Sequence, residues 1–384
     1  MMLGFLLARA GIDAVVLEKH ADFLRDFRGD TVHPSTLQVM HELGLLEAFL
    51  QRPHSEVRSI GGQIGEQFIQ LADFSRLPTQ AKFVAFMPQW EFLNFLAEHG
   101  RQYPAFHLLM RTEATGLLRD GERVSGVAAQ GPDGAVEINA DLVVAADGRH
   151  STLRDAAGLQ VVDRGAPMDV LWLRLSKQTS DPGQALGRFD TGRIFVMLDR
   201  GDYWQCAYVI PKGGIDAVRA RGLEAFRAEI RRLTPWLGGR VQEIASWDDV
   251  KLLTVAVNRL ETWCMPGLLL IGDAAHAMSP VGGVGINLAI QDAVAAANIL
   301  VPRFRAGAVG LDDLRAVQKR RALPTRLTQR MQVLIQNRVI GSVLRGDATP
   351  KPPLVMKLLG RYPMLRGLPA RIIGMGFRPE HIRH

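Results

Sequence analysis

The stretch that decides the fold is Gly267–Ala293, GLLLIGDAAHAMSPVGGVGINLAIQDA. It begins with the apolar run Leu268–Ile271, which has the length of a buried strand, and continues through a glycine-rich turn into an alanine-rich helical pattern. A buried strand that leads through such a turn into a helix is how α/β folds present a ligand at the carboxyl ends of their strands. Asp273 then lies at the strand tip, where it can accept hydrogen bonds from ligand hydroxyls, and the helix start offers free N–H groups.

A second strand-and-turn motif lies earlier, in DLVVAADGRHSTLRDAAG (141–158). Its apolar strand runs into Asp147 and Gly148, and Ser151 and Arg154 follow in the next turn. An isolated Asp-Gly pair is usually only a turn. The same pair directly after a buried strand, with Ser and Arg at these spacings, is far more specific.

Together these motifs resemble the second FAD-binding motif and the D-G motif of the class A flavoprotein monooxygenases, the p-hydroxybenzoate hydroxylase-like aromatic hydroxylases. The resemblance runs over nearly the whole chain. It implies an α/β protein with a Rossmann-like, glutathione reductase-type FAD-binding fold, an inserted mixed β-sheet substrate domain and a C-terminal helical region. The expected boundaries are 1–165 and 252–305 for the two parts of the FAD-binding domain, 166–251 for the substrate domain, and 306–384 for the helical region.

The resemblance also assigns cofactor contacts. Asp273 is expected to bond the ribityl chain and Pro280 to shape the loop beside the flavin ring. Asp147 and Gly148 are expected to lie beneath the cofactor, with the Asp147 carboxylate bonding neighbouring backbone and having no role as an acid or base. The backbone N–H groups expected to face the N1–C2 edge of the flavin belong to Gly283, Gly285, Ile286 and Asn287.

Two further contacts follow from the resemblance. Arg28 is expected to meet the phosphate side of FAD or the nicotinamide cofactor. Gln89, at the start of a helix, is expected to contact the flavin or its ribityl chain. Both residue types are also common at surfaces and at helix starts, so these assignments depend on the resemblance more than on the residues alone.

The chain begins with the second half of a nucleotide-binding βαβ unit. Met1–Ala10 predicts a helix that stops at Gly11, and Ile12–Glu18 predicts a buried parallel strand. Glu18 lies where such units place the acid that bonds the ribose. The G-x-G-x-x-G turn and the first strand would precede Met1, so we expect an unpaired strand edge and weak FAD binding by this chain. A start assigned too late and a true truncation are both compatible with this pattern.

The middle of the chain predicts a sheet-rich lobe. Short β-like pieces in 56–87 indicate an excursion from the first domain. Strands in 166–251 alternate apolar and polar residues, which is typical of a sheet with one covered face. Trp172, Trp204 and Tyr208 are the candidate lining of a substrate pocket, although core packing explains aromatic residues equally well.

Composition excludes several other classes. The chain of 384 residues has a net charge of +7 and a pI near 9.7, which fits attraction of an anionic cofactor or an acidic membrane surface. No basic block with interleaved aromatic residues indicates nucleic acid, and no metal-binding motif is present. The two separated cysteines fit a reducing compartment, so a cytoplasmic location is expected. The tail from Leu354 alternates apolar and basic residues, which predicts either closure over the substrate entrance or contact with a membrane surface or a partner.

The function implied by the resemblance is an FAD-dependent monooxygenase. NADH or NADPH would reduce the flavin, and O2 would form a C4a-hydroperoxyflavin that hydroxylates an aromatic or related electron-rich small molecule. No catalytic side chain stands out, because the cofactor carries this chemistry. Two alternatives remain at this point: a flavin-dependent reductase of the same fold, and a non-catalytic remnant that binds no flavin.

Overall fold

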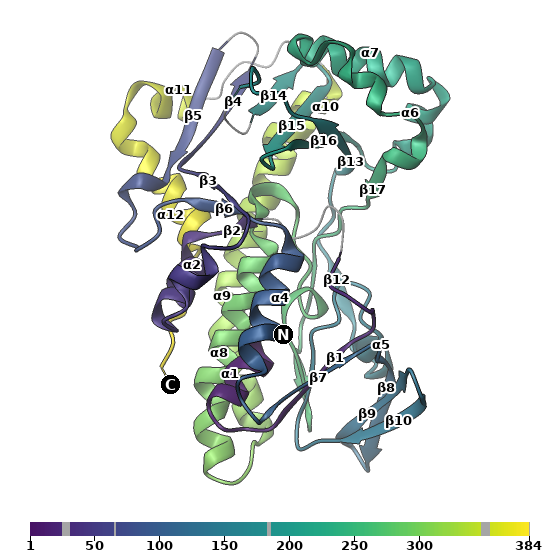
Figure 1. Cartoon of the computed structure of the whole chain (residues 1–384), viewed down its shortest axis with the longest axis vertical. Coiled ribbons are helices and arrows are strands. Elements are labelled where there is room, and N and C mark those ends of the chain that lie inside the picture. Colours follow the sequence, from purple (N-terminus) through teal and green to yellow (C-terminus); the bar gives the residue numbers. More distant parts are fainter. Residues whose placement is uncertain (25–30, 65–66, 183–185, 347–353, 384) are drawn as a thin grey trace.

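The computed structural model describes residues 1–24, 31–64, 67–182, 186–346 and 354–383. Figure 1 shows two lobes, one above the other, with the long helices α8 (Gly285–Arg305) and α9 (Leu311–Ile335) running between them. The lower lobe contains the chain start and the first sheets. The upper lobe contains the inserted sheet, covered on one side by α6 (Ile215–Ala220) and α7 (Leu223–Leu233).

The parallel strands of the lower lobe fall into two separate groups. β1 (Ala14–Glu18) pairs with β7 (Phe106–Met110), while β11 (Val143–Ala145) pairs with β20 (Leu268–Leu270). Among the described strands, β1 has no partner besides β7 and β11 has none besides β20, in agreement with the unpaired edge expected there. The remaining elements of this lobe are α1 (Met2–Arg9), α4 (Gln89–Gly100), α5 (Thr152–Ala156), β8 (Glu113–Asp120), β9 (Arg123–Gly131), β10 (Gly134–Asn139), β12 (Val161–Asp163), β18 (Asn258–Leu260) and β19 (Cys264–Met265).

The strand expected to be buried at Ile12–Glu18 is buried only in part. Within β1 only Ala14 is buried, and Val15 is 47% exposed. An apolar strand of this kind suits a position that is covered on both faces, whereas the exposure of Val15 shows that one face of β1 is incompletely covered.

The upper lobe is built around a seven-stranded sheet in the order β17-β13-β16-β15-β14-β4-β5. The segment 56–87 contributes β4 and β5, and β4 joins the sheet by parallel pairing with β14. A hairpin across Arg200–Asp202 joins β15 to β16. The strand bounds are Ser59–Ile64 (β4), Gln67–Asp73 (β5), Met168–Ser176 (β13), Leu186–Asp190 (β14), Arg193–Asp199 (β15), Tyr203–Pro211 (β16) and Lys251–Leu253 (β17).

Both faces of this sheet are buried, so the expectation of a single covered face is wrong. Residues Trp204–Ile210 of β16 are buried without interruption. One face packs under α6, α7 and the 3-10 segment Pro235–Glu243. The other face packs against Val281 and the helical segment that includes α10 (Gly341–Arg345). The inserted lobe is therefore a sheet between two layers.

Helix α8 forms the centre of the lower lobe. By length and composition the segment Val281–Arg305 resembles a membrane span, but 72% of its most apolar window is buried inside the protein. It packs against α1 and α9, as a core helix does. The elements not yet named are α2 (Pro34–Glu42), α3 (Leu46–Phe49), β2 (Thr31–Val32), β3 (Ser55–Val57), β6 (Val84–Phe86), α11 (Leu354–Arg361) and α12 (Gly367–Met375).

Candidate functional site

The two motifs identified in the sequence meet at one edge of a sheet. β11 and β20 run parallel, with Val143 opposite Leu268 and Ala145 opposite Leu270. Asp147 and Asp273 therefore follow the carboxyl ends of neighbouring strands. The Arg149 guanidinium lies 3.4 Å from an Asp273 carboxylate oxygen and connects the two loops directly.

The Asp147 loop is held by its own carboxylate. Asp147 accepts hydrogen bonds from the Ser151 hydroxyl and, at 3.1 Å, from the backbone N–H of Leu153. This confirms the expectation that Asp147 bonds neighbouring backbone. Gly148 has a positive φ of 88°, and a Cβ placed there would meet no atom within 4 Å. Space is thus left beside the turn.

Arg154 connects the same two loops from beneath. Its side chain is almost fully buried, and it donates to the Ala274 carbonyl at 3.4 Å and to the Arg149 carbonyl at 3.1 Å. A buried guanidinium that donates to both loops fixes the distance between them. Arg154 therefore holds the two loops together on the side that faces the sheet.

The glycines before α8 allow a close approach of two segments. Gly283 has a φ of 62°, and a Cβ there would lie 2.3 Å from the Thr31 hydroxyl oxygen. The same hydroxyl donates to the Gly283 carbonyl at 2.9 Å. Both the backbone angle and the available space therefore require glycine at this position. This contact between Thr31 and Gly283 joins β2 to the loop that begins at Pro280.

Asn287 secures this junction with its side chain. Its Oδ1 accepts from the His33 backbone N–H and the Thr36 hydroxyl, both at 2.8 Å. Its Nδ2 donates to the carbonyls of Thr31 at 2.9 Å and Gly283 at 3.2 Å. The side-chain amide thus makes all four of its usual hydrogen bonds within the protein. Only the backbone N–H of Asn287 is left for a ligand.

The start of α8 offers unpaired donors. Among the described residues, the backbone N–H groups of Gly285, Ile286 and Asn287 have no acceptor, as the first turn of a helix requires. The expectation for Gly283 is wrong, because its N–H donates to the Pro280 carbonyl at 3.0 Å within the turn. They point out of the amino end of a long helix, where the helix dipole favours negative charge. This end of the site fits a ligand edge that carries carbonyl oxygens.

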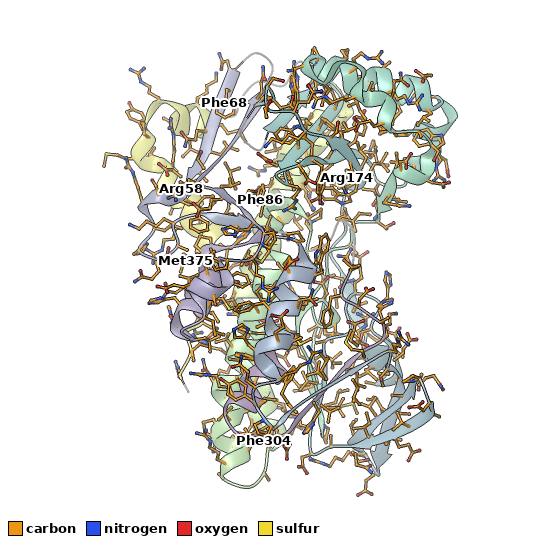
Figure 2. The ribbon with its side chains drawn as sticks, in the orientation of Figure 1. Arg58, Phe68, Phe86, Arg174, Phe304 and Met375 are labelled. Atoms are coloured by element: carbon orange, nitrogen blue, oxygen red, sulfur yellow. The ribbon has the colours of Figure 1, made fainter. Side chains whose placement is uncertain are left out.

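The structure places two of the other sequence-predicted residues, Gln89 and Glu18, at the ends of regular elements. Gln89 is the first residue of α4 and follows β6, whose Phe86 pairs with Thr31 and lies centrally between the lobes in Figure 2. Glu18 ends β1 and accepts from the His20 N–H at 2.9 Å. Burial lowers the pKa of the Met1 amino group, and the negative charge of Glu18 partly opposes this shift. The end of β1 is therefore near the start of α1. Arg28 lies outside the described residues.

Comparison with known proteins agrees with this geometry. The family described as "FAD binding domain" matches residues 1–331. The chain belongs to this family. It is 33% identical over 380 residues to 6-methylpretetramide 4-monooxygenase of Streptomyces rimosus, covering 97% of this chain and 89% of that protein. It is also 29% identical over 300 residues to rifampicin monooxygenase of Streptomyces venezuelae, covering 76% and 60% of the two chains.

Solved structures show the same fold. A probable FAD-dependent monooxygenase from Pseudomonas aeruginosa superposes with a TM-score of 0.74 at 21% identity, covering 90% of this chain and 93% of that one. Anhydrotetracycline hydroxylase from Streptomyces rimosus gives a TM-score of 0.72 at 24% identity, with 97% and 73% covered. Family and relatives together identify the chain as an FAD-dependent monooxygenase, with NADH or NADPH as the electron donor.

The structure separates the three aromatic residues expected in the substrate pocket. Trp172 packs in the same cluster as Val281, on the face next to the loop that precedes α8. Trp204 and Tyr208 lie on the opposite face, beneath α7. There Trp204 donates to Asp181 at 2.9 Å and Tyr208 to Glu229 at 2.8 Å. Of the three, only Trp172 lies on the face that adjoins the loop before α8.

A buried charge network supports the strand tip and was not predicted. Asp292 on α8 accepts from the Gly272 N–H at 3.1 Å, from Arg321 at 2.9 Å and from the His276 ring. Burial favours the neutral form of Asp292, but His276 and Arg321 outweigh it and hold the pKa of this carboxyl below its usual value. Arg321 continues to Glu380 at 3.2 Å. His276 is thus a buried structural residue.

Sequence reasoning missed three residues of the site. Arg149 stands directly after the Asp-Gly pair, and its charge next to a ligand loop was an available signal. Thr31 gave no signal, since its contact with Gly283 depends on the folded chain. Arg321 is one of several cations in the middle of α9, and only its burial in the folded chain, with 1% of the residue exposed, distinguishes it from the others.

Proposed function

We propose that this monooxygenase hydroxylates an aromatic, phenol-like small molecule, and that a fused-ring phenol is the best first candidate. Relatives that match over three quarters or more of the chain are named for 6-methylpretetramide, for anhydrotetracycline and for para-nitrophenol. The observation that carries the substrate class is the apolar cluster of Trp172 and Val281, and the one that carries FAD binding is the ion pair of Arg149 and Asp273 together with the unpaired donors of α8.

The Asp273 carboxylate and the unpaired donors of α8 each suit one part of FAD. The Asp273 carboxylate is about one-third exposed and can accept bonds from the ribityl hydroxyls. The N–H groups of Gly285, Ile286 and Asn287 suit the carbonyl edge of the ring and stabilise negative charge there. When bound, FAD would supply the redox chemistry, which is electron uptake from NADH or NADPH and activation of O2. The protein residues bind, orient and exclude water.

The side of the site next to the inserted sheet is apolar. Val281 packs with Trp172 and with Ile340 in one buried cluster on that face of the sheet. An apolar wall beside the reacting ring keeps water from the reactive centre and favours a flat, apolar substrate. This supports an aromatic substrate over a sugar or an amino acid.

The proposal is tested with the FAD-loaded chain. We expect NADH or NADPH oxidation to be stimulated by a fused-ring phenol, and labelled O2 to place one labelled oxygen in the product. Asp273→Ala should abolish both signals while the protein remains folded. Product formed equally well without O2 would instead favour the flavin-dependent reductase, and flavin lost completely on desalting would favour the non-catalytic remnant.

A further inference from the structure

The C-terminal segment 354–378 carries a surface that combines exposed apolar and basic side chains. Residues 354–378 contain five cations and no acidic residue. Within this segment five large side chains are exposed: Leu358 by 41%, Tyr362 by 51%, Met364 by 81%, Leu365 by 46% and Leu368 by 65%. Neighbouring exposed apolar side chains in one segment are unusual for a surface that only faces water.

The tail is firmly docked, so these side chains do not belong to a loose end. Leu359 and Ala370 are buried, and Ala370 lies in one cluster with Phe74 and Phe86. Arg366 fixes the turn between α11 and α12, donating to the carbonyls of residues 359 and 360, both at 2.8 Å, and to the side chain of residue 70 at 2.7 Å. One side of the tail is used for packing and the other is presented outward.

The cations beside the apolar side chains lack an ion pair among the residues that the structure describes. Lys357, Arg361 and Arg371 are exposed, and none has a carboxylate partner in the part of the chain that the structure describes. Basic residues that flank exposed apolar residues are the pattern of helices that lie in a membrane interface. Each such cation near an anionic lipid surface adds to the attraction.

Figure 1 places α11 at the outer edge of the upper lobe, away from α6 and α7. The tail therefore has free approach to a flat surface. A second protein would more often present carboxylates in a specific geometry, whereas this surface combines unpaired charge with flexible apolar side chains. Anionic lipid headgroups over an acyl layer match both features.

We propose that residues 354–375 form a reversible membrane-contacting surface for anionic lipid. Tyr362, Met364, Leu365 and Leu368 enter the interface, and the neighbouring cations contact the headgroups. This inference does not depend on the substrate proposed above, because it concerns a different surface from that of the loops at Asp147 and Asp273.

The test is co-sedimentation of the full chain with vesicles. We expect binding to phosphatidylcholine vesicles that contain roughly one-third phosphatidylglycerol, weakening with added salt, and no binding to pure phosphatidylcholine. Lys357→Gln together with Arg361→Gln should weaken binding on the order of 10- to 30-fold. Met364→Glu together with Leu368→Glu should remove it.

A matched control removes the same charge elsewhere. Arg219→Gln together with Arg231→Gln changes exposed cations of α6 and α7 and should leave vesicle binding within about twofold. Circular dichroism checks that every variant folds. Equal binding to neutral vesicles, or an equal loss in the control variant, would overturn the proposal. Self-association that disappears in the Met364 and Leu368 variant, without any vesicle binding, would assign the surface to a second copy of the chain.

Discussion

Replacing Asn287 by aspartate tests whether the junction before α8 is held as described. The substitution keeps the shape and the acceptor Oδ1 but puts an oxygen where Nδ2 now donates to the carbonyls of Thr31 and Gly283, at 2.9 and 3.2 Å. The side chain is only 5% exposed. A buried carboxylate that faces two carbonyl oxygens is strongly disfavoured, so the new group should be protonated in the folded state.

The size of the effect follows from that protonation. Holding an aspartic acid protonated at pH 7, against an ordinary pKa near 3.9, costs about 4 kcal/mol of unfolding free energy. One lost hydrogen bond adds about 1 kcal/mol. The folded pKa is raised above the unfolded value, so the penalty should grow with pH, by about 1.4 kcal/mol per unit between pH 4.5 and 7.

The assay is urea unfolding of both proteins at several pH values, followed by tryptophan fluorescence and circular dichroism. The control is Asn139→Asp on an exposed strand position, where the free energy of unfolding should change by less than about 0.5 kcal/mol. A penalty for Asn287→Asp below about 1 kcal/mol at pH 7, or one that does not vary with pH, would refute the assigned contacts.

Three further predictions concern the same region. Gly283→Ala should destabilise the protein by about 2–4 kcal/mol, because its backbone is left-handed and the new Cβ would clash with Thr31. Gly282→Ala should cost only about 1–2 kcal/mol, because the nearest side chain is 3.6 Å away. Similar losses of stability for both variants in a thermal melt would contradict this. Asp292→Asn should cost about 3–5 kcal/mol in urea unfolding, because it removes one partner of a buried pair with Arg321, and a loss below about 1 kcal/mol would contradict it. Burial lowers the pKa of His33 to about 4, so between pH 6.5 and 4 the unfolded chain binds a proton that the folded chain does not. The free energy of unfolding should therefore fall by about 3 kcal/mol over this range. His33→Asn should flatten the pH profile of stability, and an unchanged profile would count against this account.

The strand tips were predictable because their signals are local. A buried apolar run followed by an acid and a glycine specifies both a strand and the loop at its end, and this located Asp147 and Asp273. Parallel pairing then brings the two loops together without further information. The expected helix and strand at the chain start also agree with α1 and β1.

Contacts between distant segments were not predictable. Asp292 and Arg321 lie 29 residues apart, and Arg321 and Glu380 lie 59 apart, so no spacing rule connects them. The face of a strand is also uncertain when the sheet is covered on both sides. Trp172 lies on β13, whereas Trp204 and Tyr208 lie on β16. Whether they share a face depends on the pairing register of these strands, which no local pattern gives.

The central claim is that Asp273 and the start of α8 hold FAD. The most direct measurement is a titration of FAD by flavin fluorescence with the chain, with Asp273→Ala, and with Asp312→Ala at an exposed position as the control. Losing a hydrogen bond to a charged group should raise the Kd of Asp273→Ala by about ten- to a hundredfold and leave the control unchanged. Equal FAD affinity in all three proteins would contradict the account.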